Sequence, residues 1–276
     1  MVGQARTGGV VTIVVLLGFT VGIILALTGA GGGILAVPLL VFGAGLGMAD
    51  AGPIGLMAVG LAATLGAFLG LRNGTVRYKA ALLIAAAGIV CAPFGLWLAH
   101  RLPNQPLSIV FAIVLLYVAF RTFKKTMPAA ALDVPDTGPI PPCKMDDTRG
   151  KFSWTAPCAW ALALSGMLAG SLSGLLGVGG GFVMVPALQR YTNLSAQSVL
   201  ATSLAVISLV SMSGVVASAV TGHLQWGVAL PFSGGAVLGM LAGRQLAGRL
   251  AGPQLQRAFA IVSAVVAVAL LVRALV

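Results

Sequence analysis

Acidic residues are nearly absent from this chain, which has only five Asp and Glu residues together in 276 positions. Charged residues of both signs make up 8% of the sequence, whereas a soluble domain carries roughly a quarter. Hydrophobic residues make up 59%, and the mean hydropathy is +1.05. This composition excludes an ordinary soluble globular protein and indicates a chain that folds in a lipid bilayer.

The residue types that carry metal or acid–base chemistry are equally scarce. The chain has two histidines, His100 and His223, and three cysteines, Cys91, Cys143 and Cys158, without a C-x-x-C spacing. The long apolar stretches contain no internal Asp, Glu or Lys. A metal site, a redox pair and a membrane-embedded enzyme with paired acids are therefore not supported, and no cofactor is expected.

Long apolar stretches fill most of the chain. They cover about residues 10–48, 54–71, 80–99, 107–120, 156–188, 199–220, 227–240 and 255–272, and a spanning helix needs roughly 20 residues. We predict an all-α membrane protein with about eight transmembrane helices, located in the cell (inner) membrane. The first stretch is not read as a signal peptide, because its pattern recurs at 166–188, deep inside the chain.

The sequence repeats itself at an offset of 148 residues. Residues 29–38 read GAGGGILAVP and residues 177–186 read GVGGGFVMVP, and between positions 18 and 40 ten of 23 residues match their partners. Further along, FAIV occurs at 111–114 and again at 259–262. We predict two tandem four-helix repeats, residues 1–123 and 156–276.

The segment between the repeats, 124–155, has a different composition. It holds four of the five acids and a cluster of prolines at 135, 139, 141 and 142. We expect an extended cytosolic linker, in which Cys143 stays reduced. Asp50, His100 and His223 are expected at the ends of spans, as interfacial residues.

The first apolar stretch of each repeat is interrupted by its glycines. Residues 10–27 are long enough to span, but 34–48 are too short to cross a bilayer comfortably. Each repeat is therefore predicted to contain a broken or re-entrant helix, which needs protein or a wet cavity around its free backbone groups. Counting four spans per repeat favours both termini in the cytoplasm. If the short segments also cross, the repeats are inverted, and the sequence leaves this open.

The glycine runs suggest an anion site. Successive glycines can turn several amide N–H groups into one concavity, and a half-helix that starts after them adds its positive dipole end. The proposed binding glycines are Gly29, Gly31, Gly32, Gly33, Gly177, Gly179, Gly180 and Gly181. In contrast, Gly18, Gly22, Gly166 and Gly170 form small-xxx-small pairs that predict close helix packing.

The doubled G-x-G-G-G-x-x-x-V-P motif, with Ala201-Thr202-Ser203-Leu204 after the second copy, resembles the TauE/SafE sulfite exporter family of membrane permeases. The resemblance implies about eight spans in a duplicated arrangement and transport of sulfite, sulfoacetate or other small organic anions. Thr202 and Ser203 are then candidate side-chain ligands, with Asn193 and Gln197 behind them. The equivalent first-half positions, Ile54 and Gly55, carry no hydroxyl.

Together these features predict a secondary transporter, and on the family likeness an exporter, of small sulfur-containing anions such as sulfite or organosulfonates. A permease for another small organic anion and a membrane assembly protein without transport activity are the alternatives. The expected partners are the anion and the lipid bilayer, with no nucleic acid. A proton is one candidate coupling ion beside electrogenic uniport, and a homodimer is one candidate assembly.

Overall fold

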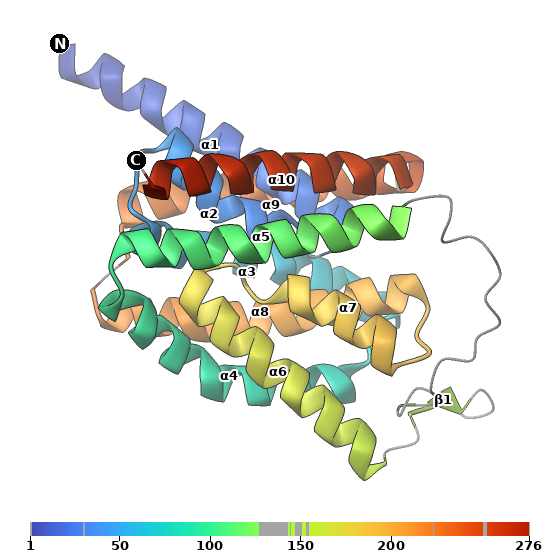
Figure 1. The fold of residues 1–276 in the computed structure, drawn as a ribbon. Coiled ribbons are helices and arrows are strands. Elements are labelled where there is room, and N and C mark those ends of the chain that lie inside the picture. Colours follow the sequence, from blue (N-terminus) through green and yellow to red (C-terminus); the bar gives the residue numbers. More distant parts are fainter. Residues whose placement is uncertain are drawn as a thin grey trace.

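The structure is a computed structural model that describes residues 2–29, 31–126, 143, 145–146, 151–152, 155–222, 224–250 and 253–275. These residues are almost entirely helical (Figure 1). A pair of two-residue strands, β1 (Met145–Asp146) and β2 (Lys151–Phe152), lies within the linker. The helices are α1 (Val2–Thr28), α2 (Gly31–Gly43), α3 (Met48–Arg72), α4 (Tyr78–Arg101), α5 (Asn104–Thr126), α6 (Ala156–Leu176), α7 (Gly181–Tyr191), α8 (Ala196–Val220), α9 (Trp226–Leu250) and α10 (Pro253–Leu275).

Eight of these helices are long and apolar enough to cross a membrane, which confirms the predicted all-α membrane fold. The other two, α2 and α7, have 13 and 11 residues. At a rise of about 1.5 Å per residue they reach roughly 16–20 Å, which is well short of a hydrocarbon core of about 30 Å. Each half of the chain thus has the same order: a long helix, a short one, and three long ones.

The long helix that opens each half packs against the fourth helix of the other half. Thus α1 packs on α9, and α6 packs on α4. Side chains added at Gly18 and Gly22 of α1 would collide with the backbone of α9. Side chains at Gly166 and Gly170 of α6 would collide with the backbone of α4 in the same way. These four glycines let the helix backbones touch, so their predicted packing role is confirmed.

Helices α3 and α8 cross at the centre of the bundle, and two thirds of each helix is buried, more than in any other described span. They run in opposite directions, because later residues of α3 contact earlier residues of α8. The contacts pair Gly70 with Ala201, Gly66 with Leu204, Thr64 with Ser208, Gly60 with Ser211, and Leu56 with Gly214. Helices α5 and α10 form an antiparallel pair beside this centre.

The helix directions show that the two halves are inverted relative to one another. Helices α1 and α9 run parallel, as do α4 and α6, because residue numbers rise together along both contacts. Since α2 and α7 each run back along the preceding helix, α1 and α6 enter from opposite ends of the bundle. The start of α1 and the end of α10 lie at one end, here called the terminal face, and α5 ends at the other, here called the linker face (Figure 1).

This arrangement corrects the expectation that the linker and both termini share a face. Four spans per half would place the linker and both termini at the same face. The short helices instead return the chain toward the face where each half began, so the linker lies opposite the termini. Arg190 lies at the end of α7 and Arg244 lies near the end of α9, so both are at the linker face with Arg72 and Arg77. Most of the described basic residues therefore lie at one face of the bundle.

The cysteines also depart from expectation. Cys143 and Cys158 are joined by a disulfide, whereas the sequence predicted a reduced Cys143 and no redox pair. Cys143 is fully buried, and its amide donates to the carbonyl of Tyr191 at the end of α7. The disulfide thus joins the linker to the start of α6, and the hydrogen bond of the Cys143 amide joins it to the end of α7. Most of the linker lies outside the described residues, and so does His223.

The tight seam between α6 and α4 gives a first prediction. Gly170→Val places a branched side chain against the backbone of Gly88, and overpacking of this kind costs about 1–3 kcal/mol or more. We expect a clear fall in the thermal unfolding midpoint of the detergent-solubilised protein. Gly234→Ala on α9 is the control, because a side chain there meets no atom within 4 Å. Equal midpoints for the two variants would contradict this packing.

Candidate functional site

The two glycine runs form the turns between the long and short helices of each half. Gly29 and Gly177 end α1 and α6 with φ angles of +72° and +71°. Beyond them the copies differ. Gly31, Gly32 and Gly33 already belong to α2, whereas Gly179 and Gly180 form a loop with φ angles of +76° and +68° before α7 starts at Gly181. Positive φ at two successive positions explains why this loop is built from glycine.

The two turns meet inside the bundle. A side chain at Gly33 would collide with the carbonyl oxygen of Val178, so the start of α2 touches the second loop directly. Each turn also contacts the central helix of the other half. Gly29 packs against Leu200 of α8, and Gly177 packs against Gly52, the equivalent position of α3. The structure therefore brings the two predicted glycine sites together at the centre.

The second loop carries backbone groups without partners. Within the described residues, the amide N–H groups of Val178, Gly179 and Gly180 make no hydrogen bond. All three residues are buried. More than nine in ten buried backbone donors in proteins are paired, with protein or ordered water. Three adjacent free donors at the start of α7, whose N-terminus carries a partial positive charge, are chemically suited to bind an anion.

Hydroxyl groups from α3 and α8 lie beside this loop. A side chain at Gly179 would come within 2.9 Å of Ser211 Oγ, and within 3.1 Å of Val59 and Ile207. Ser211 is fully buried, and its hydroxyl has no hydrogen-bond partner. One turn earlier on α8, the hydroxyls of Ser208 and Thr64 hydrogen-bond to each other at 3.2 Å. The side chains nearest the loop are therefore neutral, and only dipoles could stabilise a bound charge.

Ser173 is a further buried hydroxyl on the same hairpin. It lies one turn before the loop, and its carbonyl accepts the amide of Gly177. Its side chain is 1% exposed and has no hydrogen-bond partner. The first-half positions equivalent to Ser173 and Ser211 are Leu25 and Ala63, which are apolar. At these two pairs of equivalent positions, only the second half carries hydroxyls.

The predicted hydroxyl ligands lie elsewhere along α8. The Thr202 hydroxyl accepts a hydrogen bond from the amide of Arg77 at 3.1 Å, which ties the α3–α4 connection to α8. Ser203 donates to the carbonyl of Leu200 in its own helix. Both are fully buried. They lie in the first third of α8, just after Leu200, which contacts Gly29, whereas Ser211 lies nine residues after Thr202, about 13 Å along the helix.

The remaining predicted side chains lie at the linker face. Asn193 is exposed in the connection between α7 and α8, and Gln197 is exposed in the first turn of α8. Neither contacts the glycine loops in the described structure. The sequence prediction named the hydroxyls nearest the glycine run, Thr202 and Ser203, and did not name Ser211. The available signal was the Ser-x-x-Ser spacing of Ser208 and Ser211 inside an apolar span.

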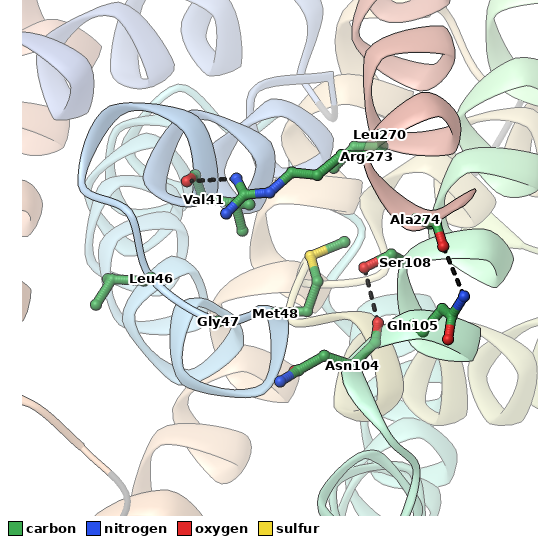
Figure 2. A pocket seen from close by; sticks show the side chains of 10 residues that line it. All are labelled: Val41, Leu46, Gly47, Met48, Asn104, Gln105, Ser108, Leu270, Arg273 and Ala274. Atoms are coloured by element: carbon green, nitrogen blue, oxygen red, sulfur yellow. Dashed lines mark hydrogen bonds between the residues drawn. The ribbon is translucent and has the colours of Figure 1, made fainter. Parts of the chain in front are cut away.

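A separate cavity of about 420 Å³ opens at the terminal face, between the α2–α3 connection, the start of α5 and the end of α10 (Figure 2). Arg273 of α10 lines it and donates to the carbonyl oxygen of Val41 at 3.1 Å. The same guanidinium lies 5.7 Å from the centre of the Phe42 ring. Because the last carbonyls of a helix lack intrahelical donors, Arg273 acts as a cap for the short helix α2.

Comparisons with known proteins agree with a membrane transporter. The family model described as sulfite exporter TauE/SafE matches residues 14–270. A probable membrane transporter protein, YunE, of Bacillus subtilis is 28% identical over 82% of this chain and 85% of its own length. Probable membrane transporter proteins of Xylella fastidiosa and Methanocaldococcus jannaschii (MJ0441) are each 27% identical, over 91% and 74% of this chain and 91% and 70% of their own lengths. No solved structure gives a significant match.

The Arg273 cap gives a second prediction. Arg273→Gln removes a charged donor from the end of α2, and a hydrogen bond of this kind at a partly exposed site contributes about 1 kcal/mol. We expect a lower unfolding midpoint in detergent. Arg190→Gln at the exposed end of α7 is the matched control and should leave the midpoint unchanged. An Arg273→Gln midpoint equal to wild type would show that the cap does not stabilise α2.

Proposed function

Because the chain belongs to the TauE/SafE sulfite exporter family and is a multi-pass membrane transporter, we propose that it moves a small sulfur-containing anion such as sulfite or an organosulfonate. The anion binds where the two hairpin turns meet, with the loop at residues 178–180 as its main backbone contact. The observation that carries this proposal is the set of three buried, unpaired amides at the start of α7.

Neutral donors can hold an anion in this place. Amide and hydroxyl groups donate hydrogen bonds that the oxygen atoms of an anion can accept, and the N-terminus of α7 adds a favourable dipole. A bare cation would find no carboxylate near the loop, since the neighbouring side chains are Val59, Ile207 and Ser211. Anion transporters with broken helices direct such helix ends at their substrates near the midplane. The same geometry serves other small organic anions, which the substrate panel below separates.

The described conformation closes the site. Residues 177–181 are all buried, so the anion reaches the loop only when the surrounding helices move apart. Two inverted halves can exchange their conformations, so that the site opens to one face and then to the other. A proton as coupling ion stays a prediction, as does a homodimer.

The charge distribution supports one orientation of the chain. Basic residues concentrate at the linker face, where Arg72, Arg77, Lys79, Arg121, Lys124, Lys125, Lys151, Arg190, Arg244, Arg249 and Arg257 lie. Among the described residues only Arg6, Arg101 and Arg273 lie at the terminal face or close to it. Loops rich in Lys and Arg stay in the cytoplasm. We therefore propose a cytoplasmic linker face, with both termini outside, in place of the cytoplasmic termini expected from four spans per half.

The disulfide argues for the opposite orientation. Cys143 and Cys158 lie at the linker face, and disulfides persist mainly in oxidising compartments. The charge asymmetry rests on many side chains and the disulfide on a single pair, so we give the charges more weight. In this orientation the disulfide would lie on the cytoplasmic side, which the reporter fusions below test.

Transport itself is the main test. Purified protein in liposomes should take up sulfite faster than empty liposomes do, with sulfoacetate, thiosulfate, sulfate, lactate and chloride as the comparison panel. Uptake of sulfite or a sulfonate ahead of lactate and chloride is the expected result. Preference for lactate would favour a permease for organic anions. No flux of any anion above the empty liposomes would favour a membrane assembly protein.

Orientation can be measured with reporter fusions in a bacterial host. Alkaline phosphatase fused after residue 276 should be active, because it folds only outside the cytoplasm. Green fluorescent protein at the same position should stay dark, and the same reporter inserted in the linker should fluoresce. A bright C-terminal fluorescent fusion would reverse the proposed orientation and favour a disulfide on the outside.

A further inference from the structure

We propose that Ser211 is a substrate ligand, whose hydroxyl binds an oxygen atom of the anion together with the free amides of residues 178–180. This inference rests on the proposed anion transport and names a side chain that completes its site. It differs from the sequence prediction, which placed the hydroxyl ligands at Thr202 and Ser203.

The Ser211 hydroxyl makes no hydrogen bond in the described structure. Its side chain is 0% exposed, and its oxygen has no hydrogen-bond partner. Other hydroxyls of α8 donate to their own helix: Ser203 to Leu200, Ser213 to Val210 and Ser218 to Gly214. An unpaired buried hydroxyl costs free energy, so its presence calls for a partner that binds there.

Ser211 is also placed beside the unpaired amides of the loop. Ser211 lies between Gly60 of α3 and Gly179 of the loop, with 3.0 Å from its Cβ to a side chain built at Gly60 and 2.9 Å from its Oγ to one built at Gly179. Both neighbours are glycines, and a methyl group at either position would crowd Ser211, so the loop and α3 lie directly against this residue. The unpaired hydroxyl and the unpaired amides therefore lie at the same place.

Ser211 lies close to the point that relates the two halves of the chain. The position equivalent to Gly60 in the second half is Ser208, one turn from Ser211, so the α3–α8 crossing lies at the centre that relates the two halves. A ligand at this centre is equally distant from both faces, as alternating access requires. The residue equivalent to Ser211 is Ala63, which cannot donate a hydrogen bond. Of these two equivalent positions, only Ser211 can therefore supply a hydroxyl to the anion.

The test compares Ser211→Ala with two controls by isothermal titration of sodium sulfite into the detergent-solubilised protein. Ser263→Ala removes an equally buried, unpartnered hydroxyl from α10, which packs mainly on α5. Ser213→Ala removes a hydroxyl that is bonded within α8. Because hydrogen bonds to charged groups are the stronger ones, we expect Ser211→Ala to raise the Kd for sulfite about tenfold or more. Both controls should keep the wild-type Kd.

Thermal unfolding without sulfite separates binding from folding. Ser211 has no partner in the unliganded structure, so Ser211→Ala should unfold at the wild-type temperature or above it. A Ser211→Ala protein that transports and binds sulfite like wild type would overturn the role of Ser211 and leave the proposed function standing. Wild-type protein that neither binds nor transports sulfite or any sulfonate would overturn both.

Discussion

The rest of this structure depends on one constraint: lipid cannot hydrogen-bond to the peptide backbone, so every N–H and C=O group within the bilayer needs a partner inside the protein. The two glycine turns break their helices inside the bundle, where the residues of the second turn are buried. Other helices of the bundle pack around both turns. The α3–α8 crossing lies against the turns, and the opening helix of each half packs on the fourth helix of the opposite half. The amides that remain unpaired in this shell define the site.

Inversion links that site to transport. Because α2 and α7 return along the helices before them, the two halves enter from opposite faces and meet at a shared centre. The faces are nonetheless chemically different, since nearly all described basic residues lie at the linker face. An anion would approach the linker face through a positive surface and the terminal face through a region with few charges. With a cytoplasmic linker face, that asymmetry favours capture of substrate from inside the cell, which suits an exporter.

The sequence predicted the membrane class, the eight long helices and the two short ones, because length and hydropathy are local properties. It could not settle the direction of the second half, because whether a short apolar helix turns back is decided by contacts such as Gly33 with Val178. For a similar reason, the sequence could not show which hydroxyl near the glycine loop lacks a hydrogen-bond partner. Thr202, Ser203 and Ser211 look alike in an apolar span, and only packing shows that two of them are hydrogen-bonded within the fold.

The central claim is that an oxyanion binds at the start of α7, and the most direct measurement is a crystal structure with selenite, the selenium counterpart of sulfite. Anomalous scattering locates selenium without relying on the shape of the density. The account predicts one peak within contact distance of the amides of Gly179 and Gly180 and of Ser211 Oγ. A well-occupied peak only in the terminal-face cavity beside Arg273, with none at the loop, would contradict it.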